Sequence, residues 1–260
     1  MEITKLGIMG PSGRMGKSLI TVSKEFKNLH VVSLCDRKDS ESVGKIIDGV
    51  KVHSDLESFL ENVDIVIDFT TPNATLELLK YLSFNKLVGL VTGTTGYDEN
   101  QIAKFNSYSK GLKVLKASNM SYGINLLQKI CEELSSKIGV ETDIEIIETH
   151  HKYKLDAPSG TALSIGNSIK KGREKIGKSK FVYRGINFNK KRDRGDIGFS
   201  AIRGGDIIGD HSVHFFLNGE RLEISHKATD RKVFSIGALK AAEWLKKQEP
   251  GLYSLLDMVR

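Results

Sequence analysis

The sequence predicts an α/β protein that starts with a doubly wound parallel sheet and continues into a separate α+β domain. Three observations predict this fold. The first 120 residues alternate apolar runs with helical patterns, a glycine-rich turn follows the first run, and strand patterns succeed one another between residues 181 and 227. The chain has 260 residues, 39% hydrophobic and 27% charged, which suits one large or two moderate globular domains.

The first domain is predicted from repeated strand and helix patterns. Val63–Phe69 is apolar enough to be buried on both faces, which is typical of a parallel sheet. Thr71 suits a helix N-cap, with Pro72 at the first helical position and the helix running to about Asn85. The other expected elements are strands at Ile3–Met9, His30–Cys35, Leu87–Val91 and Lys113–Lys116, and helices at Arg14–Lys27 and from about Asp98. We therefore expect helices on both faces of the sheet.

The pattern changes after Ser121, where the second domain is expected to begin. Asn218-Gly219 predicts a tight hairpin between two of its strands. The expected elements are a helix at Tyr122–Ile138, a strand at Thr142–Thr149, a helix from Ser159, and strands at Ile197–Arg203, Ser212–Leu217 and Arg221–Lys227. A final helix, about Lys232–Lys247, could pack on either domain.

The net charge of +7 comes from one stretch of the chain. Residues 170–194 contain eleven basic and two acidic residues, so the other 235 residues sum to −2. We interpret this stretch as a mobile or solvated loop that helps to attract an anionic substrate, and we expect no nucleic-acid partner. Two cysteines are too few for a disulfide scaffold. The absence of a charged-then-apolar leader or a long apolar run predicts a cytoplasmic protein with no membrane partner.

The glycine-rich turn is the first candidate site. Gly10, Gly13 and Gly16 follow the first strand and open a helix, as a dinucleotide pyrophosphate site requires. Asp36 ends the second strand, where an acid can accept a hydrogen bond from a ribose hydroxyl. Arg37 beside it could hold the 2′-phosphate of NADP, so the pair suggests use of both NADH and NADPH, with NADPH slightly favoured. The alternatives are an ordinary tight turn and a strand-end acid between solvated bases.

Two further loops follow buried strands, where ligands bind in a doubly wound sheet. They are Asp68-Phe-Thr-Thr-Pro72 and Thr92-Gly-Thr-Thr-Gly96. Their small hydroxyl residues and glycines allow the backbone to approach a flat ring such as nicotinamide. A plain turn is the alternative for the second loop.

The segment from Glu148 to Thr161 carries the densest chemistry. One of its two adjacent histidines could deliver a proton near neutral pH. Lys154 could neutralise an anionic substrate or assist protonation. Ser159 suits a helix N-cap, and Gly160 and Thr161 would present N–H and hydroxyl donors for a carboxylate at the helix N-terminus. A metal site is disfavoured because adjacent residues of an extended segment point in opposite directions and no third ligand is suitably spaced. Surface histidines are the remaining alternative.

The same segment resembles the signature of the dihydrodipicolinate reductase (4-hydroxy-tetrahydrodipicolinate reductase) family, which acts in the diaminopimelate route to lysine. Further family blocks occur in order along most of the chain. They are Gly13-Arg-Met-Gly16, Asp68-Phe-Thr, Thr92-Gly-Thr-Thr-Gly96, Ser118-Asn-Met-Ser-Tyr-Gly-Ile-Asn125 and Arg203-Gly-Gly-Asp-Ile-Ile-Gly-Asp-His211. Two departures are Pro11-Ser12 in the nucleotide loop and Asp36 where some members have Glu.

The resemblance implies a Rossmann-like NADPH- or NADH-binding domain over residues 1–121, to which residues 229–260 return. It also implies a domain over residues 122–228 that binds a cyclic dicarboxylate and builds a homotetramer. His150 falls on the proton donor, Lys154 on the assisting lysine, and His151, Gly160 and Thr161 on substrate contacts. The cofactor residues expected from the turn and the resemblance are Gly10, Gly13, Arg14, Met15, Gly16, Asp36, Arg37, Phe69, Gly93, Thr94, Thr95, Asn119 and Met120. No metal is expected.

Two rival functions are also compatible with these residues. Another two-domain NAD(P)-dependent dehydrogenase would share the glycine turn without needing the whole segment from His150 to Thr161. A nucleotide-sensing or nucleic-acid-binding module would use the basic stretch.

Overall fold

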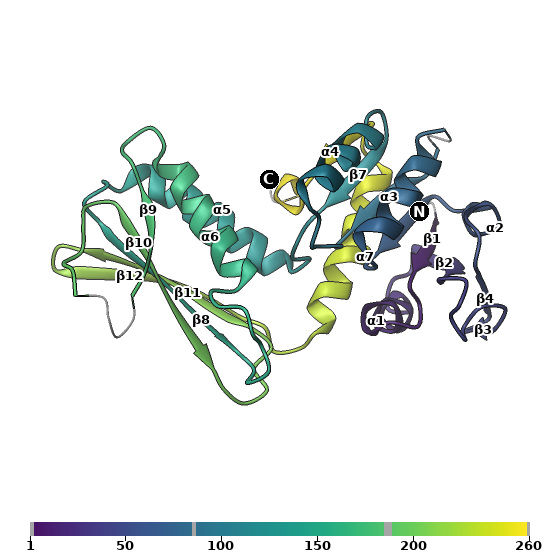
Figure 1. Ribbon diagram of the computed structural model, residues 1–260, viewed down its shortest axis with the longest axis horizontal. Coiled ribbons are helices and arrows are strands. Elements are labelled where there is room, and N and C mark those ends of the chain that lie inside the picture. Colours follow the sequence, from purple (N-terminus) through teal and green to yellow (C-terminus); the bar gives the residue numbers. More distant parts are fainter. Residues whose placement is uncertain (1–2, 85–86, 185–188, 259–260) are drawn as a thin grey trace. The chain divides into compact units, whose positions relative to one another are not determined.

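The computed structural model describes residues 3–84, 87–184 and 189–258, which form two compact units (Figure 1). Unit 1 combines the described residues up to Ser121 with Lys232–Met258, and unit 2 comprises the described part of Tyr122–Arg231. The expected fold class, an N-terminal parallel sheet followed by a mixed-sheet unit, is confirmed.

Unit 1 is built on an eight-stranded sheet in the order β13-β7-β6-β5-β1-β2-β4-β3. All neighbouring strands run parallel except β3 and β4. The chain passes to opposite sides of β1, with β2 on one side and β5 on the other, which is the switch point where such sheets bind ligands. The strands are β1 (Thr4–Met9), β2 (Leu29–Cys35), β3 (Ile46–Ile47), β4 (Val50–His53), β5 (Ile65–Asp68), β6 (Gly89–Thr92), β7 (Lys113–Lys116) and β13 (Gly251–Tyr253).

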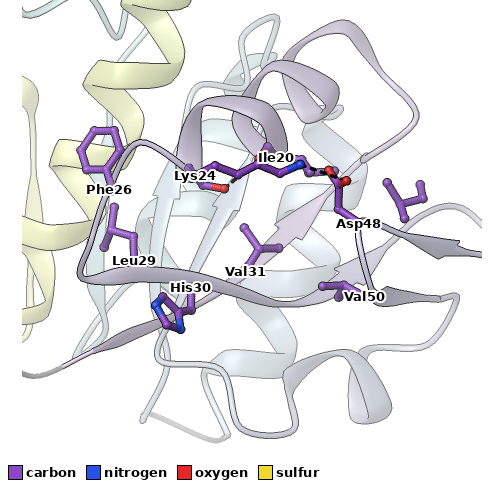
Figure 2. A pocket seen from close by; sticks show the side chains of 10 residues that line it. Ile20, Lys24, Phe26, Leu29, His30, Val31, Asp48 and Val50 are labelled. Carbon is purple, nitrogen blue, oxygen red and sulfur yellow. Dashed lines mark hydrogen bonds and ion pairs between the residues drawn. The ribbon is translucent and has the colours of Figure 1, made fainter.

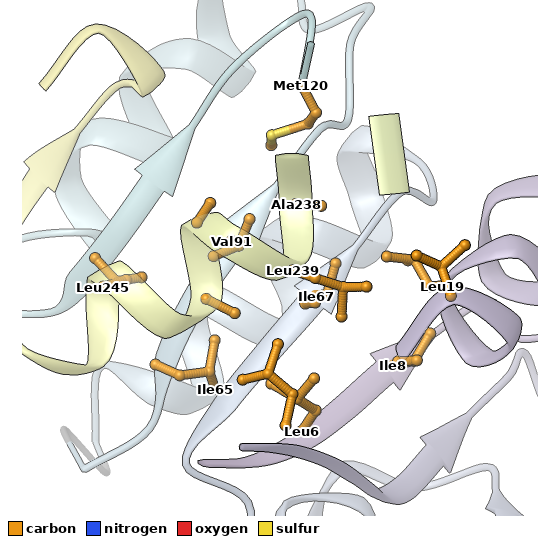
Figure 3. Packing of buried hydrophobic residues seen from close by; sticks show 14 of the residues in the cluster. Leu6, Ile8, Leu19, Ile65, Ile67, Val91, Met120, Ala238, Leu239 and Leu245 are labelled. Carbon is orange, nitrogen blue, oxygen red and sulfur yellow. The ribbon is translucent and has the colours of Figure 1, made fainter. Parts of the chain in front are cut away.

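Two hydrophobic clusters pack on this sheet. Figure 3 shows one of them, in which Leu6, Ile67 and Val91 of the strands meet Leu239 of the last helix. The final helix therefore packs within unit 1, and an added Cβ at its Gly237 would lie only 1.7 Å from the Met120 carbonyl oxygen. The helices are α1 (Arg14–Ser23), α2 (Leu56–Leu60), α3 (Pro72–Leu82), α4 (Glu99–Tyr108) and α7 (Lys232–Lys246), followed by the 3₁₀ helix η1 (Leu255–Met258).

Local signals located most of these elements. The Thr71 side chain caps α3 by accepting from the Ala74 N–H, and Asp98 forms a capping box with Gln101 at the start of α4. The structure ends α3 at Leu82, whereas the expected end at Asn85 lies outside the described residues. The β3–β4 hairpin, α2 and β13 were not predicted because elements of two to five residues carry too little periodicity.

Unit 2 is a five-stranded mixed sheet in the order β12-β11-β8-β10-β9, with α5 and α6 on one face (Figure 1). β8 is parallel to β10 and antiparallel to β11, and Asn218-Gly219 closes the β11–β12 hairpin as expected. Its elements are α5 (Tyr122–Lys137), β8 (Asp143–His150), α6 (Gly160–Arg173), β9 (Lys180–Tyr183), β10 (Asp196–Arg203), β11 (Asp210–Leu217) and β12 (Glu220–Lys227).

The interpretation of residues 170–194 as a mobile or solvated loop is wrong for much of the stretch. It contributes the end of α6 and the strand β9, and Arg173 is fully buried against the Thr142 carbonyl. Arg192 binds Glu145 and Asp143 of β8. The side chains of Arg173 and Arg192 are thus held by acceptors distant in sequence. Counting charges along the chain cannot reveal such partners. Residues 185–188 of the stretch lie outside the described residues.

Over the described ranges, none of the helices is both long and apolar enough to cross a bilayer.

Candidate active site

The glycine turn of unit 1 forms a backbone cradle at the start of α1. Gly10 adopts a φ of +70°, which favours glycine, and its carbonyl accepts a hydrogen bond from the Gly13 N–H at 3.1 Å. A Cβ at Gly16 would lie 2.1 Å from the Gly10 oxygen, so only glycine permits this packing of helix on turn. No side chain caps α1 and no acidic residue lies in its first turn. The N-terminus of α1 is therefore suited to an anion such as a pyrophosphate.

A pocket of about 760 Å³ opens beside this turn at the carboxyl ends of β1, β2 and β5. Gly10, Asp36, Arg37 and Lys38 line it together with Thr70. This size and this set of polar groups fit the adenosine half of a dinucleotide.

Asp36, which lines this pocket, is an ionised carboxylate. Its Oδ1 accepts from the Arg37 N–H at 2.9 Å, and its Oδ2 accepts from the hydroxyls of Ser40 and Ser42 at 3.1 and 2.8 Å. Partial burial opposes ionisation, but the hydrogen bonds from Ser12, Ser42, Arg37 and Ser40 outweigh it and lower the pKa of Asp36. Arg37 is mostly exposed and lies 3.3 Å from Asp39.

Asp68 joins the two loops that were expected to face nicotinamide. This fully buried carboxylate accepts from the hydroxyls of Thr70 and Thr75 at 2.5 Å and from those of Thr92 and Thr94 at 3.1 Å. The Thr94 side chain therefore turns inward, and its N–H donates to the Thr92 hydroxyl. Thr94 supports the loop, so its hydroxyl proton is not directed at a ligand.

The remaining cofactor candidates are placed by close packing. An added Cβ at Gly93 would lie 2.1 Å from the Phe69 ring, so these two candidates are direct neighbours. The Met120 side chain is buried in the core of unit 1, which leaves its backbone as the expected point of contact. The Asn119 side chain accepts from the Ser121 N–H at 2.8 Å.

A second pocket in unit 1, of about 310 Å³, contains none of the candidate residues (Figure 2). Ile20, Leu29 and Val31 line it, and an ion pair of 3.0 Å between Lys24 and Asp48 crosses its rim. Its lining mixes apolar and polar side chains, and it lies at the end of α1 opposite the glycine turn.

The site of unit 2 lies at the end of β8. Alternate residues of this strand face the helices α5 and α6, first as the apolar Ile144 and Ile146 and then as the ionisable Glu148 and His150. The strand register adds two more charged or polar side chains to this end, because Arg203 of β10 pairs with His150 and His211 of β11 pairs with Glu148.

Glu148 is the centre of this cluster. Its side chain is fully buried, and its Oε2 lies 2.5 Å from Nδ1 of His150. Arg203 donates to both carboxylate oxygens, at 2.8 and 2.7 Å, and the Ser159 N–H donates to Oε1 at 3.1 Å. His211 Nε2 lies 3.2 Å from the Ser159 hydroxyl and its ring packs edge-on against His150. One carboxylate thus holds the imidazole, the guanidinium and the start of α6.

Burial and charge set the protonation of these groups. Burial lowers the pKa of His150, and Lys154 and Arg203 act in the same direction, while Glu148 opposes them. Burial, together with the nearby His150, lowers the pKa of His211 to about 4, so His211 is neutral at pH 7. Burial of Glu148 is outweighed by Arg203 and His150, which lower its pKa and keep it ionised.

The other substrate candidates lie around this cluster. Lys154 donates to both oxygens of Asp156, at 2.7 and 2.9 Å. The Ser159 hydroxyl caps α6 by accepting from the Ala162 N–H. An added Cβ at Gly160, the first residue of this helix, would meet no atom within 4 Å. His151 Nδ1 is buried without a hydrogen-bond partner among the described residues. No group of three or more His, Cys, Asp or Glu suited to a metal occurs in the part of the chain that the structure describes.

Two family models match almost the whole chain: the dihydrodipicolinate reductase N-terminus over residues 4–120 and the dihydrodipicolinate reductase C-terminus over residues 123–259. The chain belongs to the dihydrodipicolinate reductase family. Its resemblance to this family is confirmed, and so is its assignment as an oxidoreductase of diaminopimelate and lysine biosynthesis. The family uses NAD(P)H.

Curated relatives match over their full length. The chain is 40% identical to the 4-hydroxy-tetrahydrodipicolinate reductase of Pelagibacter ubique (strain HTCC1062), covering 100% of this chain and 99% of the relative. It is 38% identical to that of Bartonella tribocorum (strain CIP 105476 / IBS 506), covering 98% and 97%.

Solved structures agree. The dipicolinate-bound dihydrodipicolinate reductase from Paenisporosarcina sp. TG-14 has a TM-score of 0.80 at 25% identity, covering 99% of this chain and all of that chain. A C. glutamicum DAP dehydrogenase, at 11% identity and a TM-score of 0.56 over 99% and 94% of the two chains, shares the fold alone.

Sequence reasoning gave no individual role to Glu148, Arg203, His211 or Asp68. The spacing of Glu148 two residues before His150 was a usable signal, because residues i and i+2 of a strand share a face. Arg203 and His211 carried no such signal, since their places depend on the pairing of β10 and β11 with β8.

Proposed function

We propose that the chain reduces 4-hydroxy-tetrahydrodipicolinate to tetrahydrodipicolinate, by way of dihydrodipicolinate, with His150 as the proton donor. The observation that carries this proposal is the His150–Glu148 pair at the start of α6, where an imidazole and helix N–H groups lie together. A dicarboxylate needs such donors at its rim, and a reduced imine needs a proton.

The dinucleotide fits unit 1 at the glycine turn. Gly10, Gly13 and Gly16 leave the backbone open to a pyrophosphate, and the pocket beside Asp36 and Arg37 accepts the adenosine half. Arg14 and Met15 lie on the first turn of α1, and Thr95 lies in the loop held by Asp68. When bound, NADPH or NADH supplies the hydride.

The residues of unit 2 orient the substrate and supply the proton. The Gly160 and Thr161 N–H groups at the start of α6 bind one carboxylate of the substrate. Lys154 leaves its partner Asp156 and binds the other substrate carboxylate. His151, which follows His150 directly in the chain, is assigned to substrate contact, and His150 protonates the electron-rich product of hydride addition. The relative from Paenisporosarcina sp. TG-14, which holds dipicolinate, supports a small dicarboxylate as ligand.

Steady-state kinetics with 4-hydroxy-tetrahydrodipicolinate and each cofactor test this function. We expect oxidation of both NADPH and NADH, because ionised Asp36 favours the ribose hydroxyl of NADH while Arg37 favours the 2′-phosphate of NADPH. Dipicolinate should inhibit in competition with the substrate. Absence of cofactor oxidation with either dinucleotide would contradict the proposal.

We also propose a homotetramer built through unit 2. α5 and α6 cover one face of its sheet, and the other face exposes Ile202 and Phe216. Four copies should appear in sedimentation velocity, and a monomer would contradict this assembly. The cytoplasmic location expected from the sequence stays a prediction.

A further inference from the structure

The protonation of the His150 ring is constrained on its Nδ1 side. Glu148 is ionised and fully buried, with both oxygens engaged by Arg203 and one also by the Ser159 N–H. An ionised carboxylate only accepts hydrogen bonds. The 2.5 Å contact between Glu148 Oε2 and His150 Nδ1 therefore requires a proton on Nδ1 in every charge state of the ring.

The Nε2 side of the ring is left open. Among the described residues, Glu148 is the one hydrogen-bond partner of the His150 ring. Gly209 lies beside Nε2, and an added Cβ there would approach this atom to 2.9 Å. A glycine at this place keeps the Nε2 edge of the ring clear for a reacting atom.

We propose that Glu148 is the positioning residue of the proton donor. It holds a proton on Nδ1 of His150 in every charge state, so the proton that the imidazolium transfers is the one on Nε2. This inference rests on the proposed function. In the transfer, the Nε2–H bond of the imidazolium breaks, its electron pair stays on Nε2, and a new bond to hydrogen forms on the reduced substrate. Solvent then returns a proton to Nε2.

The charges around the ring determine what loss of Glu148 does. Glu148 is the anion in contact with His150, while Lys154 from the following loop, Arg203 from β10 and neutral His211 from β11 are the other titratable groups that face it. Removing the carboxylate leaves the two cations unopposed, which disfavours the imidazolium. A general acid is active only while protonated, so the activity would then be lost at a lower pH.

The first test uses the wild-type protein. Nitrogen-15 NMR of the histidine rings, taken at a pH where His150 is neutral and assigned with H150Q, should show the proton on Nδ1. A neutral His150 protonated on Nε2 would overturn the proposal, and this measurement does not depend on whether any Glu148 variant folds.

The second test compares E148Q with E145Q, a matched change on the same strand whose carboxylate binds Arg192 instead. E148Q should lower kcat about 10- to 100-fold and move the alkaline limb of the pH profile of kcat/KM down by about one unit. Its KM for the dinucleotide should not change. E145Q should keep the wild-type profile. A lower kcat with an unmoved limb would show a merely structural role and refute the proposal.

The two hypotheses can fail separately. Wild-type protein that does not oxidise NADPH or NADH with the substrate refutes the proposed function, whatever the tautomer. Active wild-type protein with an unshifted E148Q profile refutes only the role of Glu148.

Discussion

In unit 1 the candidate site centres on a glycine turn and loops of small hydroxyl residues, whereas in unit 2 it centres on ionisable side chains buried at the end of a strand. Gly16 allows α1 to pack on the turn because it has no side chain, since any Cβ there would collide with the Gly10 oxygen. Glu148 serves because its two oxygens hold three different partners. Backbone recognition thus depends on local chain geometry, and side-chain recognition depends on the pairing of distant strands.

The largest expected effect separates the two regions directly. H150Q should lower kcat by about 10²- to 10⁴-fold, because it removes the proton donor of unit 2. Its dissociation constant for NADPH, measured by fluorescence, should match that of the wild type because the glycine turn is unaffected. Equal loss of turnover and dinucleotide binding would indicate a structural histidine and break the proposed division of roles.

The next effect concerns the stability of unit 2 at acid pH. The pKa of His211 falls from 6.5 to about 4 on folding, because of burial first and the neighbouring His150 next. Between pH 6.5 and 4, His211 is protonated in the unfolded chain but neutral in the folded chain. The free energy of unfolding therefore falls as the pH drops from 6.5 to 4. The loss should reach about 3 kcal/mol.

The variant H211N isolates this contribution in urea unfolding followed over the same pH range. Its free energy of unfolding should decline less steeply than that of the wild type, and H30N, a change at an exposed position of unit 1, should keep the wild-type slope. Parallel slopes for wild type and H211N would contradict the assignment.

The smallest effect should come from the backbone cradle. G16A forces a Cβ to within 2.1 Å of the Gly10 oxygen, so the turn and α1 must move apart. We expect a cost of about 1–3 kcal/mol, seen as weaker NADPH binding. Dipicolinate binding, measured by calorimetry without dinucleotide, should be unchanged; a matching loss there would show that the two sites are not separable.

Much of the fold could be predicted because its signals are local. The N-caps Thr71 and Ser159 and the Asn218-Gly219 turn each act within about four residues, and the structure places them as expected. The helix expected from about Asp98 begins at Glu99, with Asp98 as its N-cap. The β3–β4 hairpin and the pairing of the basic stretch were missed. The hairpin strands are too short to show periodicity, and the basic stretch pairs with residues distant in sequence, as Arg192 with Glu145 illustrates.

The sequence by itself determined the two-part α/β plan, the glycine turn, the family and the segment that contains His150, since each is carried by residues adjacent in the chain. Only the tertiary structure decided that Arg203 and His211 join Glu148 around His150, because β10 and β11 pair with β8 in a hydrogen-bonded register. It also decided that the Thr94 hydroxyl turns to Asp68, since a buried carboxylate must be satisfied by the nearest donors.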